Sequence, residues 1–148
     1  MDRDAIVQGW LDTLTLFGNE VKVDTALATS AALPFWLDEI RLSEDETSLM
    51  EAIMNQLDEV TLMSYRDTAD ALQQITASKL VLGDRLGKKV FVGIETNPTS
   101  EPPHITFHEE GRAVMERELQ AIHELLSVYP SYAGVSVHDY AGWRNLKE

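Results

Sequence analysis

Segments with a helical spacing of hydrophobic residues alternate along the chain with short apolar runs, and this alternation is the strongest constraint on the fold. A first helix is predicted over residues 6–17, where apolar residues recur every three or four positions and Gly18 would end the helix. The further predicted segments are a strand at 21–29, a loop at 30–46, a helix capped by Asp45 or Thr47, a strand at 60–65, a helix at 68–86, a strand at 90–95, a helix at 109–128 and a strand at 132–140. Strands that alternate with helices indicate right-handed crossovers, so an α/β fold with parallel β/α units is predicted.

Two architectures fit this order: a small open doubly wound sheet, or part of a (β/α)8 barrel. No predicted strand is followed by G-x-G-x-x-G or by G-x-x-x-x-G-K-[ST], which is a modest argument against a nucleotide-binding doubly wound sheet. Each predicted strand instead leads into polar and aromatic residues, which read "PFW", "YRD", "ET" and "HDY" in chain order. In a (β/α)8 barrel the carboxyl ends of the strands form the rim of the active site, so the barrel is favoured.

Composition limits the classes of partner. The 148 residues fit one domain, and 44% hydrophobic residues are enough for a packed core. Twelve basic and 25 acidic residues leave a formal net charge of −13, which disfavours nucleic acid and anionic membrane surfaces. The chain has no cysteine, its acidic amphipathic start is unlike a signal peptide, and no apolar stretch approaches the roughly 18–20 residues that span a bilayer. As written, a soluble cytoplasmic protein with a neutral or cationic ligand is expected.

Three stretches resemble a known group of proteins. "ITFHEEG" (105–111) and "AGVSVHDY" (133–140) are similar to segments of poorly characterised bacterial TIM-barrel proteins of the glycoside-hydrolase-like kind. "DEVTLMSYRD" (58–67) is similar to the sixth strand of chitinase-type barrels, whose motif is M-x-Y-D. Met63 and Tyr65 match that motif, whereas Arg66 stands at its aspartate and Asp67 comes one place later. His138 stands where chitinases typically carry the tryptophan of the eighth strand.

This resemblance implies that residues 1–148 form a single partial domain, the C-terminal half (strands 5–8) of a (β/α)8 TIM barrel. The acid/base carboxylates of such barrels usually lie at the end of the fourth strand, which would precede Met1, and a complete barrel needs roughly 250 residues. The chain would then be a truncated or split gene product, or two copies would complete a barrel. A half barrel exposes two parallel edges and one open apolar face, so a homo-oligomer or a missing N-terminal half is expected as the partner.

Three residues are catalytic candidates. The resemblance puts Glu95 at the nucleophile position of retaining glycosidases, which need two carboxyl groups about 5–5.5 Å apart; alternatively Glu95 is a rim carboxylate paired with Arg66. Tyr65 could hydrogen-bond a substrate or steady charge at the sugar ring, or it could cap the core. Asp67 could act in catalysis, although the start of a helix beside it makes N-capping its commoner role.

The candidates for ligand binding are Trp36, Arg66, His138, Asp139 and Tyr140. Trp36 could stack on a sugar face or plug the barrel mouth. Strand alternation would point His138 and Tyr140 to one face and Asp139 to the other, where they could bind hydroxyl groups. His138 could also act as a general acid or base, or pack under the tail beside Trp143.

No cofactor and no metal is expected. His104 and His108 are four residues apart, a spacing that binds zinc on a helix, but Pro102 and Pro103 make the first histidine non-helical. The resulting function hypothesis is a glycosidase-like fragment that hydrolyses or binds carbohydrate and is inactive without its missing half. One alternative is a non-catalytic half-barrel scaffold or ligand-binding homodimer. Another is a metal-dependent hydrolase that uses His138 and Asp139.

Overall fold

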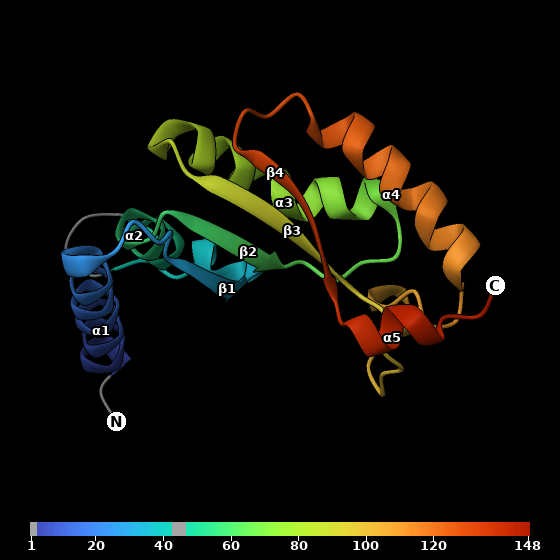
Figure 1. The fold of residues 1–148 in the computed structure, drawn as a ribbon, viewed down its shortest axis with the longest axis horizontal. Coiled ribbons are helices and arrows are strands. Elements are labelled where there is room, and N and C mark those ends of the chain that lie inside the picture. The colour runs from blue at the N-terminus through green and yellow to red at the C-terminus, as the bar shows by residue number, and fades with distance from the viewer. Residues whose placement is uncertain (1–2, 43–46) are drawn as a thin grey trace.

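A computed structural model describes residues 3–42 and 47–148 of the chain. Helices and strands alternate along it as predicted (Figure 1). The elements in chain order are α1 (Arg3–Asp24), β1 (Ser30–Pro34), the 3-10 helix η1 (Phe35–Glu39), α2 (Leu49–Gln56), β2 (Glu59–Met63), α3 (Ala69–Leu86), β3 (Lys89–Glu95), the 3-10 helix η2 (Pro103–Ile105), α4 (Arg112–Leu126), β4 (Tyr132–His138) and α5 (Tyr140–Asn145). All strand pairs are parallel, which confirms the predicted α/β class with its parallel sheet.

The four strands lie in the sheet in the order of the sequence, β1-β2-β3-β4. A doubly wound sheet reverses its strand order at a switch point, and this sheet has no reversal. Because each right-handed crossover then runs in the same direction, the connecting helices are all delivered to one face. Figure 1 shows α3 and α4 together on one side of the strands.

The core lies between that face and the helices. Its strand residues are fully or almost fully buried and pack with apolar residues of α2, α3 and α4. They are Leu33, Val60, Leu62, Val90, Val92 and Ile94. On the other face, the row of register partners Ala32, Thr61, Phe91 and Gly134 is only half-buried or exposed. We call this second surface the open face of the sheet.

The predicted strand at 21–29 is wrong. Residues up to Asp24 belong to α1, and β1 lies at Ser30–Pro34, inside the predicted loop. The alternation of Val21 and Val23 suggested a strand, but on the helix it places Val21 half-buried and leaves Val23 exposed. Gly18 does not end the helix either. It is buried within α1, where a Cβ would make an ordinary van der Waals contact, 3.5 Å from the Gln56 carbonyl oxygen, so α1 continues through this position beside α2.

The helix ends also differ in detail from the prediction. Ser48 caps α2 by accepting a hydrogen bond from the Glu51 N–H at 3.1 Å, so Thr47 is not the cap, and Asp45 lies outside the described residues. The helix predicted at 109–128 begins only at Arg112, after Gly111 in a positive-φ conformation (φ 86°). A Cβ on Gly111 would lie 2.8 Å from the Lys147 carbonyl oxygen, so this glycine lets the C-terminal tail pack against the start of α4. The predicted strand 132–140 ends at His138, and Tyr140 begins α5.

Across residues 3–42 and 47–148, no helix combines the length and the apolar character required to cross a membrane.

Candidate functional site at the carboxyl ends of the strands

The carboxyl ends of β2, β3 and β4 bring three of the predicted site residues together. Register pairs Glu95, the last residue of β3, with His138, the last residue of β4. Both follow open-face positions at a spacing of two residues, so their side chains lie on that face. Tyr65 follows β2 by two residues, and its ring stacks on His138 with 6.0 Å between ring centroids and 19° between planes.

Glu95 and His138 are hydrogen-bonded at 2.7 Å between Oε2 and Nδ1. An ionised carboxylate only accepts hydrogen bonds, so Nδ1 of His138 carries the proton in this contact. The contact leaves Nε2 as the ring nitrogen available to a ligand. The His138 side chain is 58% exposed, whereas that of Glu95 is only 12% exposed. Glu95 therefore orients the imidazole from its buried side, and the His138 ring is exposed to solvent.

The second carboxylate oxygen of Glu95 is also engaged. Oε1 accepts hydrogen bonds from the N–H groups of Thr96 and Asn97, both at 2.8 Å, and from the Asn97 side-chain amide at 3.0 Å. Burial raises the pKa of Glu95, but the hydrogen bonds from Asn97, His138 and Thr96 together outweigh burial and lower the pKa below its usual value. Glu95 is therefore ionised at neutral pH.

Tyr65 contributes a protonated phenol. Burial, and then the negative charge of Glu95, raise the pKa of Tyr65. Gly93 gives the tyrosine ring its space, because a Cβ there would lie 3.3 Å from Tyr65 Cε1 and 2.5 Å from the Leu62 carbonyl oxygen. Tyr65 can thus donate or accept a hydrogen bond at neutral pH beside the exposed histidine.

Two polar residues that the sequence analysis did not single out hold this site together. The Thr96 hydroxyl donates to the His138 carbonyl oxygen at 2.9 Å, which ties the end of β4 to the loop after β3. The carbonyl oxygen of Asn97 accepts from the Thr106 hydroxyl at 2.7 Å. Their position directly after Glu95 in "ETN" is the signal that could have identified them.

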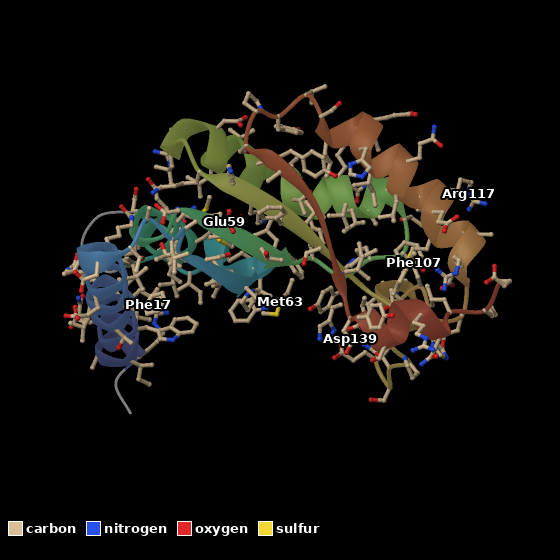
Figure 2. The ribbon with its side chains drawn as sticks, viewed as in Figure 1. Phe17, Glu59, Met63, Phe107, Arg117 and Asp139 are labelled. Carbon is tan, nitrogen blue, oxygen red and sulfur yellow. The ribbon has the colours of Figure 1, made fainter. Side chains whose placement is uncertain are left out.

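Asp139 lies at the start of α5, where Figure 2 labels it below the end of β4. The peptide bond between His138 and Asp139 is cis. Asp139 Oδ1 accepts from the Gly142 N–H at 2.8 Å, so the aspartate caps α5. This hydrogen bond is the main reason that the pKa of Asp139 is lowered, and Asn97 and His138 also contribute. Asp139 therefore caps α5, and its hydrogen bond with Asn97 keeps it next to the site.

Tyr140 and Trp143 do not join His138. Strand alternation ends at His138, so Tyr140 is carried by α5, where its ring lies 5.9 Å from that of Trp143. Trp143 in turn receives the Arg112 guanidinium, 4.9 Å from its ring centroid. The predicted pairing of Tyr140 with His138 on one face is therefore wrong. The alternative that packs His138 under the tail beside Trp143 is also wrong, because the His138 side chain is 58% exposed.

Arg66 and Asp67 point to other elements. Arg66 Nη1 donates to the Tyr65 carbonyl oxygen at 2.6 Å, and its guanidinium lies 5.4 Å from the centroid of the Phe35 ring. The proposed ion pair between Arg66 and Glu95 is wrong, because the Glu95 carboxylate is instead hydrogen-bonded to His138 and Asn97. Asp67 donates its backbone N–H to the His104 carbonyl oxygen at 3.1 Å. The residue that hydrogen-bonds the first N–H of α3 is Glu118 of α4, at 3.0 Å from Ala69 N.

Trp36 lies in η1, directly after β1, and remains well exposed. Two strands separate β1 from β4, which places β1, the strand that precedes Trp36, roughly 14 Å from the strand that carries His138. Trp36 is therefore at the same end of the sheet as the other candidates but at its far edge. A ligand would have to span the sheet to contact both residues.

Histidine and carboxylate groups do not gather into a metal site in the described part of the chain, where no group of three or more is arranged to hold an ion. His104 lies in η2 and His108 in the turn after it. The metal-dependent alternative stays a hypothesis from the sequence.

A scan against protein-family models, a search of curated proteins and a search of solved structures found no match to this chain. The residues at the centre of the site are Glu95, His138 and Tyr65. Together they present an ionised carboxylate, an exposed imidazole nitrogen and a protonated phenol. Such a set can recognise hydroxyl groups and can move a proton at Nε2 of His138.

Proposed function

We propose that this chain is the strand 5–8 half of a glycosidase-like (β/α)8 barrel, and that its strand-end site binds a carbohydrate. The sequential order of four parallel strands supports this architecture, because a barrel is wound in the same sequential way. The placement of Glu95, His138 and Tyr65 at neighbouring strand ends supports a site at the rim, where barrel enzymes carry their functional groups.

The observation that carries the proposal is the 2.7 Å contact between Glu95 and His138, with Tyr65 stacked on the imidazole. The contact engages Nδ1 of His138, so Nε2 is the ring nitrogen left for a ligand. Nε2 and the Tyr65 hydroxyl would hydrogen-bond sugar hydroxyl groups. A neutral sugar also suits a chain of net charge −13, which would repel phosphorylated ligands.

Hydrolysis requires more than this half supplies. A retaining glycosidase uses an ionised carboxylate as nucleophile and a second carboxyl group as acid/base. The lowered pKa of Glu95 is in keeping with the first role, although four hydrogen bonds engage its two oxygens. The second carboxyl group would come from the chain that completes the barrel. Alone, the chain binds its ligand; Glu95 serves in hydrolysis only when the barrel is complete.

Binding is tested by titrating the purified chain with neutral mono- and oligosaccharides and recording saturation-transfer NMR and calorimetry. At least one sugar should bind, and His138→Ala and Tyr65→Phe should each weaken binding about tenfold, the effect of losing one hydrogen bond to a ligand. The matched controls are His123→Ala and Tyr132→Phe, because these residues form a second Tyr–His pair away from the site, hydrogen-bonded at 2.7 Å. Failure of every sugar to bind, or equal loss in the controls, would contradict the proposal.

Catalysis is tested with aryl glycosides on the chain joined to its other half. Glu95→Gln should abolish turnover while the fold, followed by circular dichroism, is kept. Turnover that survives this substitution unchanged would remove Glu95 from the mechanism.

A further inference from the structure

Helix α1 carries an apolar stripe that its own chain leaves exposed. Val7, Leu11 and Leu14 pack against the core. Beside them on the helix surface lie Ile6, Trp10 and Phe17, which are 52%, 49% and 48% exposed. We call these three residues the α1 stripe. Figure 2 shows Phe17 on the side of α1 that is turned toward the strands.

The position of α1 in the chain explains why this stripe exists. In a series of β/α units, a crossover helix packs over the strand that follows it and the strand that precedes it. α1 precedes β1, but within the described residues β1 has a neighbour on one edge only, β2. α1 packs against α2, and in this scheme its stripe is the surface left for the outward side chains of a strand next to β1.

The opposite edge of the sheet, formed by β4, also lacks a neighbouring strand in the described residues. β4 is paired with β3 only, as far as the described residues go. Val137 is the register partner of the fully buried Ile94 and lies on the helix side of the sheet, yet it is 37% exposed. Within residues 3–42 and 47–148, the helix that follows β4 is the short α5. In this part of the chain, β4 thus has a free edge and an outward apolar side chain that is partly exposed.

We propose that a second copy of the chain docks here, with β4 of one copy parallel to β1 of the other and Val137 packed on the α1 stripe. Each chain has both contact surfaces: the β1 edge with the α1 stripe, and the β4 edge with Val137. A two-fold axis therefore produces the same contact twice, as an isologous interface requires. Two copies supply eight strands, the number that closes a (β/α)8 barrel. The inference rests on the barrel half proposed above, but it does not depend on the ligand.

The surface approaches the size that a stable dimer buries. The α1 stripe exposes on the order of 300 Å². The open face of four strands, at about 4.8 Å per strand and 3.3 Å per residue, adds on the order of 300 Å² more. With the two strand edges, the total approaches the roughly 800 Å² per partner of a standard interface. Charge works in the other direction, since each copy carries −13.

The first test is the molar mass of the full chain by size-exclusion chromatography with light scattering, without sugar, over a range of concentrations. The wild type should be a dimer. Phe17→Glu and Val137→Glu should each weaken association about 30-fold or more, because a buried charge would replace an interface anchor. The matched control is Leu16→Glu, since Leu16 is 63% exposed but lies on α1 away from the stripe. This variant should stay dimeric.

A second test fixes which surfaces meet. The chain has no cysteine, so Phe17→Cys and Val137→Cys chains can be mixed and treated with a short bis-maleimide. Cross-linked heterodimer is expected, and a Leu16→Cys chain mixed with Val137→Cys should give none. A monomeric wild type, a dimer that survives both glutamate substitutions, or equal cross-linking of the control would overturn the proposal. A dimer that binds no sugar would contradict only the proposed carbohydrate-binding function. A monomer that binds sugar would contradict only the proposed dimer.

Discussion

Gly93 is the residue on which the geometry of the site depends most directly. It lies on β3 two residues before Glu95, and the Tyr65 ring occupies the space next to it. Strand alternation predicts which face Gly93 is on, but only the packing of Tyr65 and the Leu62 carbonyl shows why a side chain is excluded there.

Gly93→Ala should destabilise the protein by about 1–3 kcal/mol, because the added methyl group overpacks the sheet, and it should displace the Tyr65 ring from His138. Urea unfolding measures the loss of stability. Gly9→Ala is the control, since a Cβ at Gly9 meets nothing within 4 Å and alanine should raise helix stability. Equal stability of Gly93→Ala and wild type would contradict the packing argument.

Residues at the strand ends were predictable one by one. Tyr65, Glu95 and His138 each follow an apolar run, and parallel strands bring such residues to one edge. The partner of each side chain was not predictable in the same way. Arg66 was expected beside Glu95 because the charges are opposite, whereas its guanidinium lies over Phe35. A contact depends on rotamer and backbone direction after the strand has ended, and a pattern of residue types does not contain these.

At the scale of elements, Asp58 connects α1, the start of β1 and the start of β2. Its Oδ2 accepts from the Thr29 N–H at 2.8 Å and from the Thr29 hydroxyl at 2.9 Å, at the entrance to β1. Its Oδ1 accepts from Lys22 of α1 at 3.0 Å. These contacts, the Thr29 backbone first and Lys22 next, lower the pKa of Asp58 to about 2.

Asp58→Asn should therefore lower Tm at neutral pH by a few degrees. A lowered pKa in the folded state means that the stabilisation is fully present above the unfolded pKa of 3.8 and is lost as pH falls through about 2. The difference between variant and wild type should accordingly shrink between pH 4 and pH 2. Thermal melts across this range check it, with Asp24→Asn, an exposed carboxylate in the last turn of α1, as control. A pH-independent difference would contradict the assignment.

Element boundaries show where local pattern and tertiary packing diverge. The strand period of Val21 and Val23 suggested a strand, but both residues belong to α1, which packs against α2 and leaves Val21 half-buried. The start of α3 was expected to be capped locally by Asp67, but Glu118 provides the acceptor from 49 residues away. Both results follow from long-range contacts that override a weak local preference.

At the scale of the whole molecule, the net charge of −13 opposes both compact folding and association of two copies. Raising sodium chloride from low to moderate concentration should raise Tm by a few degrees and strengthen dimerisation, because salt screens this repulsion. Melting curves and light scattering at several salt concentrations measure the two effects. A fall in Tm with salt would show that attractive ion pairs such as Lys22–Asp58 outweigh the repulsion.

The chain sequence alone determined the alternation of helices and strands, the parallel sheet and the three polar side chains at its carboxyl edge, since these follow from periodicity and from the direction of parallel strands. Tertiary structure decided the extent of α1, the position of β1, the Glu95–His138 contact with its shell of Thr96 and Asn97, and the exposure of the α1 stripe. The physical reason is the range of the interactions. Periodicity records which side of an element is apolar, but what covers that side depends on segments distant in sequence or on another chain.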